Sequence, residues 1–132
     1  MKTPNLFANI PLHNPDKECF ECLINTDSIM IERIISKGHK STQSDGWLAQ
    51  ERNEWIVVLK GRARILFEDK VSIQLDEGDY LNIPSHKKHK VEWTDPDIET
   101  IWLAVHYQAK ENTMNTTEEH NDTFATQSNL LF

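Results

Sequence analysis

The chain has 132 residues, of which 38% are hydrophobic and 27% are charged, and this length supports one domain with a single modest core. Fourteen Lys and Arg against 21 Asp and Glu give a formal net charge of -7, whereas a surface that binds duplex nucleic acid needs a basic stripe. No apolar run approaches the ~20 residues that cross a bilayer. The N-terminus also lacks the long apolar stretch of a secretion signal. We therefore expect a soluble, cytoplasmic protein that binds neither nucleic acid nor membrane.

The first 17 residues differ in character from the rest of the chain. They hold three prolines, Pro4, Pro11 and Pro15, and show no sustained hydrophobic period. Because proline interrupts regular structure, residues 1–17 are predicted to form an extended arm that lies on the domain.

Short apolar segments separated by Gly, Asp or Pro come next, spaced roughly ten residues apart, and many are rich in Ile, Val, Trp and Tyr, the pattern of β-strands. No helical period is present that would allow parallel crossovers. We therefore predict an all-β, antiparallel sandwich or barrel over residues 18–109. The predicted strands are 18–24, 29–35, 54–60, 62–68, 71–75, 79–83, 88–93 and 99–107.

Alternation along the strands assigns faces. In 88–93, His89, Val91 and Trp93 share one face and three charged residues share the other. His89 is therefore predicted to point inward, since the opposite choice would bury the three charges. In 99–107 the two faces are about equally apolar, and the pattern does not choose between them.

Glu54 is the one carboxylate in a strand that is apolar on both faces. A carboxylate and an imidazole in an apolar interior must be paired, hydrogen-bonded or bound to a cation, so Glu54 and His89 are the residues to explain. An ion pair with Arg33 is one explanation for Glu54. A neutral imidazole held by a hydroxyl or a backbone group is the corresponding explanation for His89.

The two cysteines form the CxxC pattern Cys19-Phe20-Glu21-Cys22, a spacing found in zinc sites and redox pairs. Residues three apart in a strand point in opposite directions, so these are predicted to be ordinary strand cysteines. The alternative is a structural zinc site made by Cys19, Cys22, His86 and His89.

Residues 110–132 are dominated by Asn, Thr, Glu and Ser. Such a segment buries too little apolar surface to offset the entropy of ordering it. It is predicted to be a disordered acidic tail.

Two motifs carry a family resemblance. Glu54 is followed after six residues by Gly61, and the segment Gly78-DYLNI-Pro84-S-His86-KK-His89 repeats the Gly, Pro and His spacing of a second motif. Together they resemble the cupin superfamily, and most closely its small single-domain members. His86 stands where the family often has Gly. At the positions of the usual His-x-His pair, this chain has Trp47 and Ala49, or Leu48 and Gln50.

The resemblance implies a cupin jelly-roll barrel that forms a homodimer, and the apolar arm residues Leu6, Phe7 and Ile10 are the candidates for reaching a second subunit. It also points to a divalent-metal site in the barrel. Two imidazoles and a carboxylate suit Fe(II) and also accept Mn, Ni or Zn. The predicted ligands are Glu54, His86 and His89, with Gln50, His106 and Trp93 as further pocket residues.

The predicted function is therefore a metal-binding pocket that binds or acts on a small polar molecule. The alternative is a non-catalytic module that binds a small ligand without metal, and a scaffold with no ligand is a third class. A fold of this kind hosts many activities, so the sequence assigns no catalytic residue and leaves open whether the protein is an enzyme.

Overall fold

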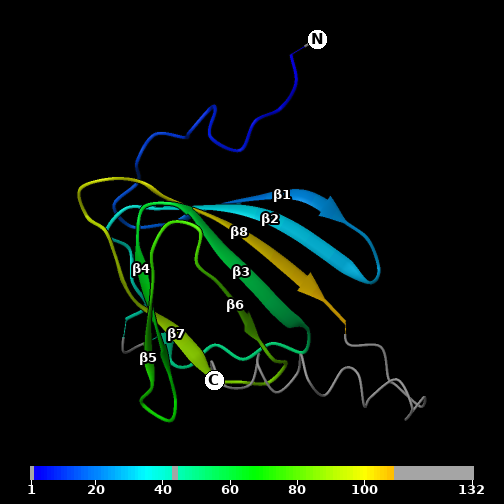
Figure 1. The fold of residues 1–132 in the computed structure, drawn as a ribbon, viewed down its shortest axis with the longest axis vertical. Helices are drawn as coiled ribbons and strands as arrows, with labels where there is room; N and C mark the ends of the chain where they lie inside the picture. Colours follow the sequence, from blue (N-terminus) through cyan, green and yellow to red (C-terminus); the bar gives the residue numbers. More distant parts are fainter. Residues whose placement is uncertain (1, 43–44, 109–132) are drawn as a thin grey trace.

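The computed structural model describes residues 2–42 and 45–108 (Figure 1). Within these residues the chain forms eight strands, each overlapping one of the predicted segments. The predicted tail, 110–132, lies outside the described residues. The strands are β1 (Cys19–Asn25), β2 (Ile29–Ser36), β3 (Asn53–Lys60), β4 (Ala63–Phe67), β5 (Ser72–Leu75), β6 (Tyr80–Ile83), β7 (His89–Thr94) and β8 (Thr100–Tyr107).

The strands form two antiparallel sheets (Figure 1), which confirms the predicted all-β class. One sheet has the order β1-β2-β8-β3-β6 and the other β5-β4-β7. Strand β8 lies between β2 and β3, so that His106 pairs with Met30 on one side and with Glu54 on the other. The order therefore brings residues from distant parts of the sequence together along β8.

The core fills the space between the two sheets. Strand β8 turns Trp102 and Ala104 into it, which settles the face that the sequence left open. Fully burying one large aliphatic or aromatic side chain stabilises a fold by about 1.5–3 kcal/mol, so this cluster is the main source of stability. Its buried members are Ile34, Ile56, Val58, Ala63, Ile65, Phe67, Leu75, Leu81, Ile83, Trp102 and Ala104.

A bulge in β7 changes the side to which its last residues point. Val91 pairs with Ile65, and Trp93 pairs with Arg64. Strand β7 therefore has one extra residue, Glu92, between the partners of two consecutive β4 residues. An extra residue of this kind inverts the alternation beyond it. Trp93 consequently lies on the outer face beneath the guanidinium of Arg64, 5.3 Å from the ring centre, rather than on the face of His89.

Arg33 fastens the N-terminal arm to the outer face of β2. Its side chain is buried, and it donates to the carboxylate of Glu21 and to the arm carbonyls of Leu6, Ala8 and Asn9, the last three at 3.0, 2.7 and 3.2 Å. Arg33 therefore does not pair with Glu54, the alternative raised by the sequence, because the two side chains lie on opposite faces of the sheet.

Gly61 marks the close approach of the β3–β4 turn to β8. Its φ is +87°, and a Cβ added there would lie 2.7 Å from the Cα of Thr100. Only glycine fits both the left-handed backbone and the lack of space.

Both cysteines lie on β1 and are free thiols, as expected for strand cysteines. In the described part of the chain, no helix has the length and the apolar character needed to cross a membrane.

Candidate functional site: the barrel pocket

A pocket opens between the two sheets, with a volume of about 120 Å³. Most of its apolar lining belongs to the core cluster. Its polar side chains come from β2, β3, β7, β8 and the segments before β1 and β3, and they are Glu18, Glu32, Gln50, Glu54, His89 and His106. A small cavity with an apolar wall and a few convergent polar groups is the usual form of a ligand site.

Glu54 and His89 meet in this pocket. His89 is 5% exposed, and its Nε2 lies 3.5 Å from Oε1 of Glu54. The other ring nitrogen, Nδ1, lies 2.9 Å from the carbonyl oxygen of Lys87, to which it donates. The backbone therefore fixes the orientation of the imidazole and directs Nε2 at the carboxylate.

Gln50 joins this pair to a second one. Its Nε2 donates to Oε1 of Glu54 at 3.3 Å, while its Oε1 accepts from Nδ1 of His106 at 2.9 Å. The Nε2 of His106 in turn lies 2.9 Å from Oε1 of Glu32. The five side chains thus form one continuous chain of contacts, His89–Glu54–Gln50–His106–Glu32, across a cavity whose other lining residues are apolar except for Glu18.

These contacts shift both imidazoles toward protonation. The hydrogen bond to Glu32 raises the pKa of His106, against the opposing effect of burial. For His89 burial is the largest influence and lowers the pKa, but the contacts with Glu54 and with the Lys87 carbonyl together outweigh it, so the net shift is upward. Each imidazole therefore has a carboxylate to balance its charge.

The structure brings four of the predicted site residues together, namely Gln50, Glu54, His89 and His106. His86 is exposed and lines a shallow surface depression with Lys88. Its backbone has φ +67°, in the region that favours Gly, and its N–H donates to the carbonyl of Gln50 at 2.7 Å. The Pro84 turn therefore directs the His86 side chain away from the pocket.

Glu32 is a pocket residue that the sequence did not single out, and so is Glu18. Glu32 shares a face of β2 with Met30 and Ile34, so a lone carboxylate in an apolar alternation was present, as it was for Glu54. The long-range pairing of β2 with β8 is what gives Glu32 a partner.

The structure also decides which residues occupy the His-x-His positions. Leu48 and Gln50 line the pocket. Trp47 is turned outward, where the Lys90 ammonium lies 4.4 Å from the centre of its ring. The pair is therefore Leu48 and Gln50, rather than Trp47 and Ala49.

A resident divalent metal needs three or four donor atoms that converge on one point. Glu54 and His89 supply two. Leu48 has no donor atom, Gln50 presents its NH₂ group to Glu54, and both ring nitrogens of His106 are engaged. Within residues 2–42 and 45–108, no group of three or more His, Cys, Asp or Glu side chains is placed to hold a metal ion. The residues present do not fit a resident metal.

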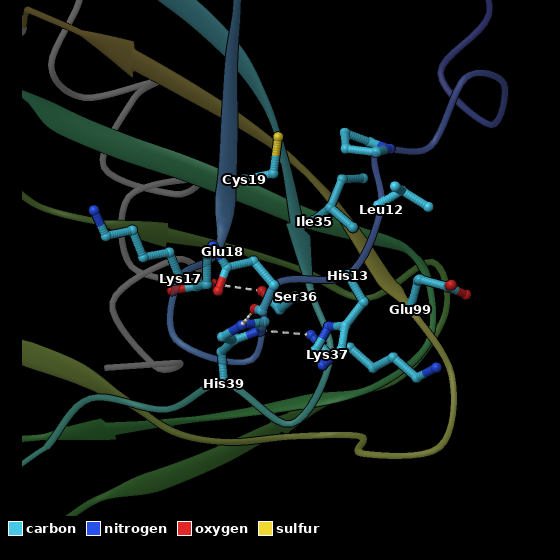
Figure 2. Close-up of a pocket in the computed structure, with 12 residues that line it drawn as sticks. Leu12, His13, Lys17, Glu18, Cys19, Ile35, Ser36, Lys37, His39 and Glu99 are labelled. Carbon is cyan, nitrogen blue, oxygen red and sulfur yellow. Dashed lines mark hydrogen bonds between the residues drawn. The ribbon is translucent and has the colours of Figure 1, made fainter.

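A second cavity, of about 260 Å³, lies between the arm and the ends of β1 and β2 (Figure 2). The ring of His39 is fixed there, since its Nδ1 accepts from the N–H of Lys37 at 2.8 Å and its Nε2 donates to the carbonyl of Asn14 at 2.6 Å. The charges around it are mixed, with Lys17 and Lys37 against Glu18 and Glu99. Here Ser36 donates to Glu18, and the His39 ring bonds to two backbone groups. The barrel pocket instead joins five side chains from distant strands, and it remains the candidate site.

Comparison with known proteins agrees with this fold. The family model described as Cupin domain matches residues 36–106. The chain therefore belongs to the cupin domain family. No curated protein matches it.

Among solved structures, one from Ralstonia eutropha JMP134, named a putative mannose-6-phosphate isomerase, is 40% identical, with a TM-score of 0.76, over 83% of this chain and 100% of that one. A cupin superfamily protein from Desulfitobacterium hafniense DCB-2 is 18% identical, with a TM-score of 0.65, over 83% and 94%. An RmlC-like cupin from Desulfovibrio desulfuricans is 17% identical, with a TM-score of 0.62, over 80% and 96%. The last two share the fold alone.

Proposed function

We propose that the barrel pocket binds a small, uncharged polar molecule, held by the polar chain from His89 to Glu32 and by the apolar residues that line the rest of the cavity. The observation that carries this proposal is the polar chain itself. Five connected hydrogen-bonding side chains converge on a cavity whose other lining residues are apolar except for Glu18. These side chains already satisfy one another within the protein, but a carboxylate oxygen can accept more than one hydrogen bond, so a ligand with hydroxyl groups can add donors from the cavity side.

The charges of the lining count against an anionic ligand. Glu18, Glu32 and Glu54 contribute three carboxylates, and none of the described residues that line the pocket is Lys or Arg. The two imidazoles are already paired with carboxylates. An anion such as a phosphate would therefore meet negative potential without a free cation to bind it.

The volume sets the size of the ligand. About 120 Å³ is several times the ~10–15 Å³ that one water molecule requires, but less than the ~300 Å³ at which sites for larger ligands begin. We therefore expect a compact molecule, such as a short polyol or hydroxycarbonyl compound.

The likeness to the Ralstonia protein favours a second candidate, isomerisation of a sugar phosphate. The lining charges count against its phosphate group. The lysines Lys17 and Lys37 belong to the cavity under the arm, with Glu18 on the boundary of both cavities. Mannose 6-phosphate is therefore included as a probe that separates the two candidates.

The test is the thermal midpoint of the full chain with glycerol, dihydroxyacetone, D-mannose or mannose 6-phosphate, because a ligand that binds only the folded state raises the midpoint. We expect a neutral probe to raise it, with a smaller rise in Gln50→Leu and an unchanged rise in the surface control Gln74→Leu. A rise with mannose 6-phosphate alone would favour the isomerase candidate, and no rise with any probe would refute ligand binding. Conversion of mannose 6-phosphate, followed by NMR, would establish the enzyme.

We further propose that the protein is a cytoplasmic homodimer. The free thiols of Cys19 and Cys22 suit a reducing compartment. On the side of β8 away from the pocket, Leu103 and Val105 lie on an apolar outer face, and Phe7 of the arm is 55% exposed. Light scattering should give twice the chain mass for the full protein and the monomer mass after removal of residues 1–12, and an unchanged mass would exclude the arm from the interface.

A further inference from the structure

Leu48 and Gln50 lie beside His89 and Glu54 in the pocket. Leu48 lies directly opposite His89, since the two exchange backbone hydrogen bonds of 2.8 and 3.0 Å in an isolated antiparallel bridge. Side chains of directly opposed residues stand side by side on the same face. Gln50 reaches Glu54 at 3.3 Å from four residues earlier in the chain.

We infer that Leu48 and Gln50 exclude a divalent metal from this cupin pocket, and that replacing both with His converts it into a metal site completed by Glu54 and His89. The inference concerns the same pocket as the proposed function, but it does not require that a small molecule bind there.

In the present chain the hydrogen-bond network takes the role that a cation would have. The Glu54 carboxylate is satisfied by His89 and by the amide of Gln50, so its charge needs no metal. A metal held by Glu54 and His89 alone would lose the Gln50 contact and would stand against the isobutyl group of Leu48. Two protein donors are fewer than the three or four of established sites.

The positions of Leu48 and Gln50 predict that a His at each would add a metal-binding imidazole to the pocket. An imidazole at position 48 would stand beside that of His89 across the bridge, and one at position 50 would replace the amide that already reaches Glu54. The His89 ring is already oriented by its hydrogen bond to the Lys87 carbonyl, the kind of support that ligating histidines have in metal sites. Three imidazoles and a carboxylate then face one point.

The experiment compares the wild type with Leu48→His, Gln50→His and the double variant, each titrated with Co²⁺ and with Zn²⁺. The readouts are visible absorption of bound Co²⁺, metal content after gel filtration, and the thermal midpoint. We expect the double variant to hold one metal ion per chain, to gain Co²⁺ absorption and to rise in midpoint. Adding His89→Ala to the double variant should abolish all three changes, whereas adding His86→Ala, at an exposed position, should not.

Wild-type protein that retains one ion of Co²⁺, Zn²⁺, Mn²⁺ or Fe²⁺ per chain, lost in His89→Ala, would overturn the inference. So would a folded double variant that binds no metal. If the double variant does not fold, Leu48→His keeps the inference testable, because residue 48 is 44% exposed and tolerates a polar side chain. That variant should bind Co²⁺ more tightly than the wild type, and equal affinity would refute the inference.

The outcomes are separable from those of the proposed function. A wild type that excludes metal but responds to none of the neutral probes leaves this inference standing and removes the small-molecule ligand. A wild type that binds metal and also a neutral probe removes this inference alone.

Discussion

Gln50→Leu is the substitution that most directly tests the polar chain of the barrel pocket. Gln50 is the link between the two imidazole–carboxylate pairs, and leucine has nearly the same size but neither a donor nor an acceptor. The substitution therefore leaves the Nδ1 donor of His106 without its protein acceptor and takes one hydrogen bond from Glu54.

The magnitude follows from these two contacts. A hydrogen bond that involves a charged group contributes about 1.5–3 kcal/mol, and a long one contributes less. The loss of the 2.9 Å bond to His106 and the 3.3 Å bond to Glu54 therefore costs about 3 kcal/mol, and the added apolar surface of leucine returns about 1 kcal/mol. The expected net destabilisation of about 2 kcal/mol corresponds to a fall of roughly 8 °C in the thermal midpoint for a domain of this size.

The assay is urea unfolding followed by tryptophan fluorescence, with calorimetry for the midpoint. Gln74→Leu is the matched control, because Gln74 is exposed on β5 and its side-chain amide donates to Asp76, two residues away on the surface. A surface change of this kind should stay within about 0.5 kcal/mol. If Gln50→Leu is as stable as Gln74→Leu, the polar chain does not contribute to stability and the reasoning fails.

Three further predictions concern pH, the arm and the β3–β4 turn. The hydrogen bond to Glu32 raises the pKa of His106, so the stability that this contact contributes should be full below pH ~6.5 and lost as pH rises through the folded-state pKa. In urea unfolding at several pH values, the wild type should lose its stability advantage over His106→Gln as pH rises. A stability advantage that grows with pH would contradict this. Arg33→Met should free the arm and cost about 3 kcal/mol, seen as faster tryptic cleavage in the arm than in Arg52→Met; equal cleavage rates would show that the arm is held by other contacts. Gly61→Ala places a Cβ 2.7 Å from the backbone of β8 and should lower the unfolding free energy by about 2–4 kcal/mol; an unchanged midpoint would mean that the turn shifts without cost.

The strands were readable from the sequence because alternation and turn residues act over a few positions. The apolar strand around Glu54 and the sharp division of charges beside His89 identified the two residues that meet in the pocket. The same reasoning failed for Trp93, because the bulge at Glu92 inverts the side to which it points, and a bulge of this kind has no marker in the β7 sequence.

The turn at Pro84 shows a second limit. Spacing alone leaves open whether His86 turns toward His89, and the answer depends on one backbone conformation, φ +67° at His86. This left-handed conformation directs the His86 side chain to the surface. His86 is therefore not in the pocket, although its spacing had suggested it as a metal ligand.

What the sequence determined is the architecture, together with the buried acid and imidazole, because each follows from local patterns of polarity. Only the tertiary structure decided the partners of those two groups. Glu32 and His106 are 74 residues apart in the chain, and they meet because β8 inserts between β2 and β3. Pairing between strands distant in sequence depends on the packing of the whole sheet, and no single segment contains that information.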